Sequence, residues 1–364
     1  MVVVKKVVRK RSGTAGFGGP SRSASSLRPA FVEKEPPCGH ACPCGTDVRG
    51  FLNVLAFGAT RGLTETQAIE EAFYLIADRN PLPAVCGRLC PHHCETGCSR
   101  EGYGGSVSIN QIERAIAEAA INASWPLRPA DGASVPETAG EPVTVIGAGA
   151  AGLSVAYQLA RRRYDVTLAD PHDEAGGELR YGIEAERLPR AVLDAEVDRI
   201  LALGVSFVGG ADVAKFEAAG PRVLKTRIYE DGSPVATGAI AAAIHFGRHA
   251  AALLDAEVRH TVVPPAPVKL LQVARDRINL DHFQRAARGA ATGATWTPAE
   301  AIHEAQRCLQ CGACVECDNC WKYCPDQAVI KPLDRDQPYR FRLEYCQGCS
   351  KCAEQCPTGY IEMR

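Results

Sequence analysis

The cysteines near the end of the printed sequence are spaced as iron–sulfur ligands. They form two runs of the pattern C-x2-C-x2-C-x3-C-P. Four thiolates at this spacing bind a cubane 4Fe-4S cluster, and in two-cluster ferredoxins the fourth cysteine of each run binds the other cluster. The predicted ligands of one cluster are Cys314, Cys317, Cys320 and Cys356, and those of the other are Cys346, Cys349, Cys352 and Cys324.

Two other uses of cysteine were weighed against this interpretation. Pairs of cysteines two residues apart also bind zinc, and short cysteine-rich segments form disulfides. Neither use requires the C-x3-C-P ending that occurs here twice, and disulfides need an oxidising compartment. We therefore favour clusters. Cys308 and Cys311 precede the first run without an assigned role, as free thiols or as alternative ligands.

A second group of cysteines lies between residues 38 and 98. Cys86, Cys90, Cys94 and Cys98 follow one another at four-residue steps, which places thiols on one helix face or in one tight loop, close enough to share a metal. Apolar residues at helical spacing predict helices over 48–57, 64–78 and 106–123 around them. Cysteines clustered in this way are typical of metal ligation in a reducing cell interior, so we expect a cytoplasmic protein.

The middle of the chain carries a dinucleotide-binding pattern. Gly147, Gly149 and Gly152 occupy the three positions of G-x-G-x-x-G between a predicted strand and a predicted helix. The pyrophosphate is expected at the start of that helix, next to Ala150, where free amides and the helix dipole favour negative charge. Asp170 ends the second predicted strand, where an acidic side chain binds ribose hydroxyls. The pattern predicts a Rossmann-like dinucleotide fold.

The N-terminal cysteine block resembles a known iron–sulfur domain. The segment GRLCPHHCETGC, followed by SVSINQIERAI, is similar to the N-terminal domain of the glutamate synthase small subunit and of dihydropyrimidine dehydrogenase. The ligands that this resemblance implies for one cluster are Cys42, Cys90, Cys94 and Glu113. A solvated carboxylate at the start of a helix is the alternative role for Glu113.

The same resemblance implies a second N-terminal cluster. Its ligands would be Cys38, Cys98 and a C-x2-C pair upstream of Cys38. Ala30 and Glu33 stand where that pair is expected, so the second cluster is in question unless Cys44 or Cys86 substitutes. The sequence therefore predicts at least one N-terminal cluster.

The run AGGELRYGI is similar to the segment that follows the FAD-binding motif in the same family. The resemblance implies an FAD lobe with further contacts from Gly177, Arg180 and Asp231. The family also has a second fingerprint, which binds NADPH, but only a short stretch without such a loop separates Phe207 from Tyr229. Hydride transfer needs close, aligned atoms. We therefore expect a chain that binds FAD but does not oxidise NAD(P)H alone; a lobe without FAD is the alternative.

The C-terminal segment looks like the ferredoxin domain of the DsrL-type iron–sulfur flavoprotein, the electron partner of dissimilatory sulfite reductase. RPAFVEKEPPC and DRINLDHF fit that family as well. The resemblance implies an electron-transfer subunit whose partner is dissimilatory sulfite reductase. Related subunits serve 2-oxoacid and benzoyl-CoA oxidoreductases, so a flavin-free scaffold or ferredoxin-type subunit of such a complex is the alternative. No side chain is predicted to be catalytic, because the chemistry belongs to the cofactors.

Composition and length describe a multidomain protein of mixed α+β and α/β class. The 364 residues carry a net charge of -1, with 46% hydrophobic and 23% charged residues, which favours neither nucleic acid nor a membrane surface as partner. The fold class expected is a helical N-terminal iron–sulfur domain, a reduced Rossmann-like FAD lobe and a C-terminal two-cluster ferredoxin domain. The predicted boundaries are a basic disordered tail (1–30), the helical domain (31–124), a linker (125–141), the truncated FAD lobe (142–260), a linker (261–297) and the ferredoxin-like domain (298–364).

Overall fold

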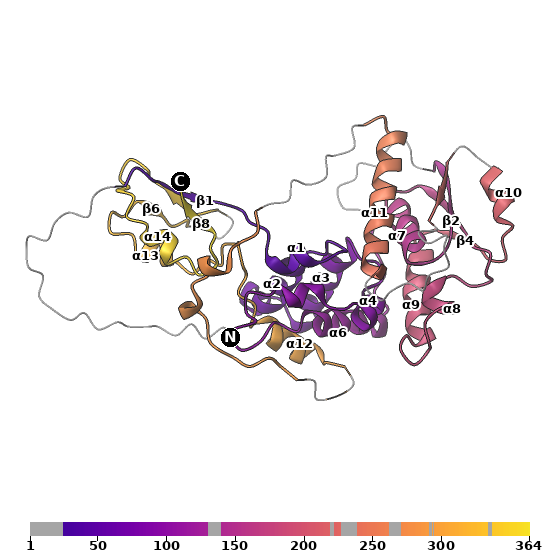
Figure 1. Ribbon diagram of the computed structural model, residues 1–364, viewed down its shortest axis with the longest axis horizontal. Coiled ribbons are helices and arrows are strands. Elements are labelled where there is room, and N and C mark those ends of the chain that lie inside the picture. Colours follow the sequence, from indigo (N-terminus) through magenta and orange to yellow (C-terminus); the bar gives the residue numbers. More distant parts are fainter. Residues whose placement is uncertain are drawn as a thin grey trace, which may run out of the picture.

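The computed structural model describes residues 25–129, 140–218, 222–226, 239–261, 271–290, 293, 295–333 and 337–364. They form an elongated molecule with a cysteine-rich lobe at one end, a helical domain in the middle and an α/β lobe at the other end (Figure 1). Fold class is therefore as expected: mixed helix and sheet in three parts. The predicted flavin contact Asp231 and residues 1–24 of the predicted tail lie outside the described residues.

The helical domain is built around three amphipathic helices. Its elements are α1 (Pro37–Ala41), α2 (Val48–Phe57), η1 (Ala59–Arg61), α3 (Glu65–Ala77), α4 (Pro83–Leu89), α5 (His93–Thr96) and α6 (Ile109–Asn122). The three helices expected from periodicity are confirmed as α2, α3 and α6. Thr64 and Gln67 cap the start of α3 reciprocally. Phe73 and Ile116 are buried between the helices, which therefore share one core.

The α/β lobe contains a short parallel sheet. Its elements are β2 (Pro142–Ile146), α7 (Ala150–Ala160), β3 (Asp165–Ala169), α8 (Glu178–Tyr181), α9 (Arg190–Leu201), β4 (Ser206–Val208), α10 (Val213–Ala218), β5 (Val223–Lys225) and α11 (Ala239–Val258). The strand order β4-β3-β2-β5, all parallel, is that of a Rossmann half. The predicted strand–helix–strand unit is confirmed as β2, α7 and β3. Helix α11 lies along α7 (Figure 1).

The cysteine-rich lobe consists of short elements around loops. The elements from residue 275 onward are η2 (Arg275–Arg277), η3 (Leu280–His282), α12 (Pro298–Ala305), α13 (Asn319–Lys322), β6 (Val329–Ile330), β7 (Arg340–Phe341), α14 (Lys351–Glu354) and β8 (Ile361–Met363), and those after α12 belong to this lobe. Here the structure differs from the expected disordered tail, because its last residues enter β1 (Pro29–Phe31), which pairs with β8. The ring of Phe31 stacks on Phe341 at 4.4 Å. The start of the described chain is thus held on the C-terminal lobe.

Helix α12 also differs from the expected boundaries. It was expected to open the ferredoxin domain at residue 298, but it packs on α2, α3 and α6 of the helical domain. The physical reason is its apolar face, because Ala301 and Ala305 are fully buried in the helical core. The predicted helix itself is confirmed, since Thr297 and Glu300 cap its start. The polypeptide therefore crosses from the helical domain to the cysteine-rich lobe after α12.

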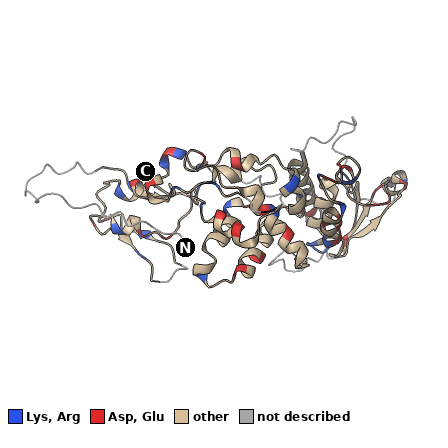
Figure 2. Ribbon diagram, turned by 90° about the horizontal axis from the view of Figure 1, so that it is seen from below, with Lys and Arg blue, Asp and Glu red and all other residues tan. Residues whose placement is uncertain are grey.

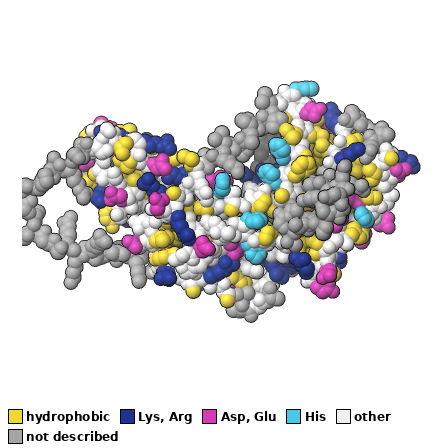
Figure 3. Space-filling view, in the orientation of Figure 1, with side chains coloured by type: hydrophobic (Ala, Val, Ile, Leu, Met, Phe, Trp, Pro, Cys, Tyr) yellow, Lys and Arg dark blue, Asp and Glu magenta, His cyan; other side chains and the backbone are white. Residues whose placement is uncertain are grey.

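The surface carries both signs of charge without separating them. Basic and acidic side chains alternate along the ribbon in Figure 2 and over the face shown in Figure 3. Among the helices that the structure describes, none is long and apolar enough to cross a membrane.

Candidate metal centres and dinucleotide site

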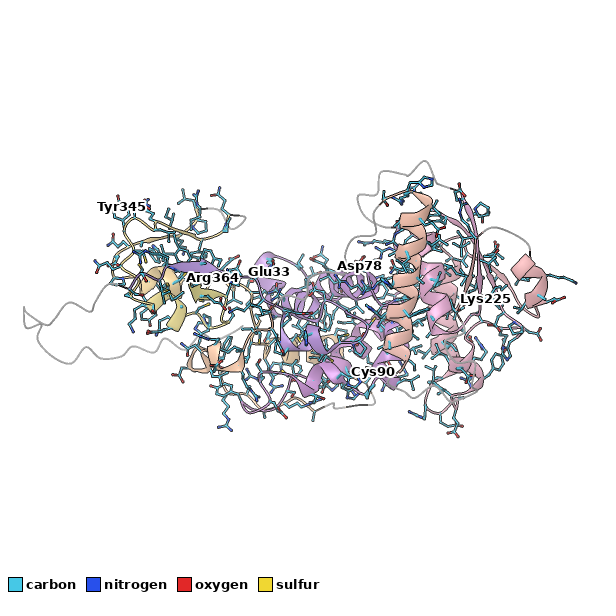
Figure 4. The ribbon with its side chains drawn as sticks, turned by 45° about the horizontal axis from the view of Figure 1, so that its top comes forward. Glu33, Asp78, Cys90, Lys225, Tyr345 and Arg364 are labelled. Atoms are coloured by element: carbon cyan, nitrogen blue, oxygen red, sulfur yellow. The ribbon has the colours of Figure 1, made fainter. Side chains whose placement is uncertain are left out.

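Three thiols and one carboxylate of the helical domain lie near one another. Cys42 follows α1, Cys90 follows α4, Cys94 lies in α5 and Glu113 lies in α6. Burial, and after it the facing Glu113 carboxylate, raise the pKa of the Cys42 and Cys94 thiols. Three thiols and a carboxylate from four segments fit the donor set of an iron–sulfur cluster, and their role as ligands stays a prediction. Figure 4 shows Cys90 close to the α/β lobe.

Glu113 is a half-buried acid with one hydrogen-bond donor beside it. Burial raises the pKa of Glu113 to about 7. The amide of Asn80 donates a hydrogen bond to Glu113 Oε1 at 3.0 Å, which lowers the pKa of the carboxyl group but less than burial raises it. Within the described residues it forms no ion pair, so a carboxylate here lacks the cationic partner that a buried charge requires. A bound iron would supply that positive charge.

Three small cavities are each lined by four cysteines. Their cysteines are Cys314, Cys317, Cys320 and Cys356 in the first, Cys324, Cys346, Cys349 and Cys352 in the second, and Cys38, Cys98, Cys308 and Cys311 in the third. Each cavity is lined by four thiols in the same way, so one kind of group suits all three. In the first two cavities, three cysteines come from one run and the fourth comes from the other run, Cys356 in the first and Cys324 in the second.

The chemistry of the cavities favours clusters over single ions. In the part of the chain that the structure describes, no group of three or more His, Cys, Asp or Glu side chains is arranged to hold one metal ion. The four thiolates around a cubane bind its four separate iron atoms, so they surround a cavity and do not converge on a point. Thiols that line a cavity, as here, therefore fit the cubane.

The cysteine loops of the C-terminal lobe repeat one backbone geometry. Asp318 and Ser350 occupy the same place in the two runs and have φ values of 65° and 63°. Each precedes a one-turn helix that carries the third cysteine of its run, Cys320 in α13 and Cys352 in α14. The positive φ turns the chain so that three thiols face inward. Backbone N–H groups also approach the sulfur atoms, as that of Ala328 does to Cys324 Sγ at 3.2 Å.

The third set was not predicted from the sequence. Cys38 and Cys98 were expected to share a cluster with an upstream pair, and Cys308 and Cys311 had no role. The structure places Cys308 and Cys311 beside Cys38 and Cys98, although more than 200 residues separate the two pairs in the chain. A signal was present, because Cys308 and Cys311 have the C-x2-C spacing that is missing before Cys38.

Cys44 and Cys86, the substitutes considered for that missing pair, have other partners. The Cys44 thiol donates to the carbonyl oxygen of Arg79 at 3.6 Å. The Cys86 thiol donates to Asn80 Oδ1 at 3.8 Å. Burial raises the pKa of both thiols. Neither thiol lines the cavity that contains Cys38 and Cys98, so neither cysteine fits the role of a substitute ligand there.

The glycine loop of the α/β lobe has the geometry of a phosphate site. Gly147 has a φ of 101°, which favours glycine. A Cβ on Gly152 would lie 1.7 Å from the Gly147 carbonyl oxygen, so only glycine allows α7 to pack this closely. A Cβ on Gly149 would meet nothing within 4 Å. The backbone before Ala150 is thus open, at the start of α7, where the pyrophosphate was predicted.

The other predicted cofactor contacts have partners within the lobe. The two carboxylate oxygens of Asp170 accept hydrogen bonds from the Ala148 N–H at 2.6 Å and from His172. The Arg180 guanidinium forms ion pairs with Asp194 and Glu174. Gly177 has a φ of 48°, and a Cβ there would lie 2.9 Å from Gly149 Cα. These residues therefore shape the glycine loop, and their direct contact with a cofactor stays a prediction.

We call Cys42, Cys90, Cys94 and Glu113 the Cys42 group. The α/β lobe adjoins this group through two side chains. Glu196 in α9 is fully buried and accepts hydrogen bonds from the N–H groups of Ala84 and Val85 at the start of α4, at 2.6 and 3.0 Å. Arg248 in α11 lies near the thiols of Cys42 and Cys44, which raise the pKa of its guanidinium, while burial lowers it more strongly. Asp78, near the same junction in Figure 4, accepts from Arg161. The dinucleotide lobe and the cysteine group are thus directly connected.

Comparisons with known proteins agree with this arrangement. Residues 31–125 match the family model for the dihydropyrimidine dehydrogenase domain II, 4Fe-4S cluster. Residues 145–196 match the NAD(P)-binding Rossmann-like domain.

Similar proteins are subunits of oxidoreductases. An NAD-dependent dihydropyrimidine dehydrogenase subunit PreT homolog of Salmonella typhi is 36% identical over 180 residues, 49% of this chain and 40% of the relative. The NADP(+)-dependent formate dehydrogenase subunit beta of Moorella thermoacetica is 35% identical over 187 residues, which cover 47% of this chain and 25% of the relative. The NADPH-Fe(3+) oxidoreductase subunit beta of Geobacter sulfurreducens is 32% identical over 190 residues, which cover 51% of this chain and 26% of the relative.

The matched stretch spans less than half of the length of each of these relatives. The DsrL type is not among the matches that we describe. Residues 31–125 are thus similar to a 4Fe-4S domain, residues 145–196 belong to a Rossmann-like dinucleotide-binding region, and about half of the chain is similar to iron–sulfur oxidoreductase subunits.

Proposed function

We propose that the chain is an electron-transfer iron–sulfur flavoprotein subunit that relays electrons between a flavin and a partner redox enzyme. The observation that carries the proposal is the placement of the cysteine sites. The Cys42 group adjoins the dinucleotide lobe, and two four-cysteine cavities lie in the lobe at the opposite end (Figure 1). Such a distribution suits a relay, because clusters conduct single electrons between separate sites.

FAD is the dinucleotide that we propose for the α/β lobe. Bound FAD interconverts paired and single electrons, which is the step that a relay between hydride chemistry and clusters requires. The residues that would hold it are Gly147, Gly149 and Gly152 with the N–H groups of α7. Support for a cofactor at this place comes from the open backbone at Gly149 and from α11 of the same lobe, whose Arg248 lies near Cys42.

Oxidation of NAD(P)H by this chain alone is not part of the proposal. The stretch from β4 to β5, where the resembling family inserts its NADPH domain, contains α10 and completes the same four-stranded sheet. Electrons would therefore reach or leave the flavin through another protein.

The partner that we propose is dissimilatory sulfite reductase, by the resemblance of the C-terminal segment. The relatives named above are subunits, which supports a protein partner of some kind. The alternative is a flavin-free scaffold or ferredoxin-type subunit of a 2-oxoacid oxidoreductase. Flavin content separates the two: a chain that assembles its clusters but is isolated without flavin contradicts the flavoprotein.

An anaerobic titration tests the relay. The chain is mixed with NADPH, then NADH, then dithionite, and the flavin and cluster absorbance is followed. We expect both chromophores to stay oxidised with the nicotinamides and to bleach with dithionite. Prompt bleaching of the flavin by either nicotinamide would show a self-sufficient NAD(P)H oxidoreductase.

A further inference from the structure

The segment that carries Cys308 and Cys311 is anchored in the helical domain. Arg307 is buried and forms an ion pair with Glu304, which is itself buried. Its guanidinium also donates to the carbonyl oxygens of Gly104 and Gly105, both at 2.8 Å. Glu304 Oε1 accepts from the Ser108 N–H at 2.9 Å. A buried pair whose remaining hydrogen bonds are satisfied holds one geometry, so the residue that follows Arg307 has a defined position in this domain.

The next residues are held by the helical domain as well. Arg49 in α2 donates to the carbonyl oxygen of Cys311 at 3.0 Å, and Asn53 in the same helix donates to Gln310 Oε1 at 3.1 Å. Arg100 donates to the carbonyl oxygen of Arg307 at 2.9 Å. The C-x2-C pair is therefore part of the helical domain in space, although it lies next to the ferredoxin runs in sequence.

Cys38 and Cys98 face this pair. The pKa of the Cys38 thiol lies well above its usual range, first because the thiol is buried and then because the thiols of Cys308, Cys311 and Cys98 oppose it. All four thiols line one cavity. The two cavities formed by the ferredoxin runs are lined by four thiols in the same way.

Unused polar groups surround the same cavity. Arg100, which lines the cavity, has no hydrogen-bond partner at Nε among the described residues, and Gln310, between the two thiols of the pair in sequence, has none at Nε2. The side chain of Ser99, which also lines the cavity, lies against the Cys311 thiol. The three residues are at most 4% exposed. A buried donor without a partner is costly. Sulfide and thiolate sulfur atoms accept hydrogen bonds, so a cluster would satisfy donors of this kind.

We propose that a further 4Fe-4S cluster is held by four cysteines from two distant parts of the chain, namely Cys38, Cys98, Cys308 and Cys311. The C-x2-C pair of the C-terminal segment stands in for the pair that is missing upstream of Cys38. The site goes beyond the proposed function, because its existence depends on neither the flavin nor the partner.

The proposed cluster joins the other sites through shared segments. Cys38 and Cys42 are four residues apart, as are Cys94 and Cys98, so two short segments link it to the Cys42 group. Cys311 and Cys314 are three residues apart, so a third segment links it to the first ferredoxin cavity. Without this cluster, the N-terminal group and the ferredoxin cavities have no ligand-bearing segment in common. With it, the sites form one continuous series.

Iron content and spectroscopy test the site directly. The full chain is reconstituted anaerobically, and iron and acid-labile sulfide are counted beside the Mössbauer spectrum. We expect four clusters, about 16 iron atoms per chain, and Cys308→Ala and Cys311→Ala should each lose about four iron atoms and one set of reduced-cluster EPR signals. Cys44→Ala is the matched control, since it removes a buried thiol outside the cavity, and should keep the full content.

Each other result counts against the proposal. A wild-type chain that saturates at about 12 iron atoms, and whose N-terminal signal disappears in Cys42→Ala, overturns it, because the three clusters present are then the other three. An alanine variant with wild-type iron and EPR signals overturns it too. One equivalent of zinc in place of the lost iron would assign the four thiols to a zinc ion, against the cluster.

Discussion

Single side chains set the electrostatics of the Cys42 group. Glu113 brings a carboxylate among three thiols, and Arg248 brings a guanidinium from the α/β lobe. Arg248 Nε is buried and has no hydrogen-bond partner among the described residues. The potential of a cluster depends on net charge and on hydrogen bonds to its sulfur atoms. Both residues can therefore be tested by spectroscopy without a partner protein.

Glu113→Ala should remove one ligand of the N-terminal cluster. We expect EPR of the reduced chain to lose the signal of that cluster, while Glu113→Cys, which restores a ligand, should keep a cluster with an altered g-tensor. Glu71→Ala, which truncates an exposed carboxylate in α3, is the control. If Glu113→Ala keeps the unaltered signal, Glu113 is not a ligand.

Arg248→Gln should lower the reduction potential of the same cluster. Loss of a nearby positive charge favours the oxidised state, by on the order of tens of millivolts. EPR-monitored redox titration measures the shift. Arg128→Gln, at an exposed arginine that stacks on Tyr74 and pairs with Glu70 of α3, should leave the potential unchanged. An equal shift in both variants would mean that the effect is one of overall charge.

At the scale of elements, the contact between α9 and α4 holds the α/β lobe on the helical domain. Glu196 comes from α9 but fills the place of a capping residue at the start of α4. Arg199, one turn later, lies over the ring of Phe73 in the helical core at 5.2 Å. Packing of this kind makes the two parts one unit, although they were predicted as separate domains joined by a linker.

Glu196→Ala should destabilise this junction. It leaves two buried N–H groups without acceptors, at a cost on the order of 2–4 kcal/mol of unfolding free energy. Urea unfolding of the cluster-loaded chain measures it, with Asp198→Ala on the exposed side of α9 as the control. Equal midpoints for both variants would contradict the capping role.

The same residue predicts a pH dependence. Burial raises the pKa of Glu196 from 4.5 to about 7. Between these values the folded chain binds the proton that the unfolded chain has lost, so this residue's contribution to stability decreases as the pH rises from about 4.5 to about 7. Glu196→Gln should flatten the profile in that window, measured as thermal midpoint against pH. A profile as steep as that of the wild type would contradict the shift.

At the scale of the whole molecule, the cysteine sites extend from the α/β lobe to the opposite end. The ferredoxin lobe carries exposed aromatic side chains, among them Tyr345, which is 59% exposed and lies toward the end of the molecule in Figure 4. The terminal cavity formed with Cys349 adjoins this end. We therefore expect electrons to be exchanged with the partner through the ferredoxin lobe.

Cys349→Ala tests that route. The variant should lose the cluster of the terminal cavity and transfer electrons to an external protein acceptor at least about tenfold more slowly, because one member of the series is missing. Stopped-flow reduction of the acceptor measures the rate, and Cys44→Ala is the control. Delivery at the wild-type rate would remove the terminal cavity from the route.

Local chemistry determined much of this protein in the sequence alone. The spacing of the two C-terminal runs indicates cubane ligands because each loop is short enough for its own backbone to position three thiols. The glycines around Gly149 indicate a dinucleotide turn for the same reason, and the periodicity of α2, α3 and α6 indicates their buried faces. In each case the residues that act together are neighbours along the chain.

Only the tertiary structure decided which distant segments meet. Cys308 and Cys311 lie beside Cys38 because the buried face of α12 and the Arg307–Glu304 pair fit the helical domain. β1 and β8 pair because the backbone N–H and carbonyl groups of the two strands match. Such contacts depend on complementary surfaces that form after the local elements, so spacing along the chain does not show which distant segments meet.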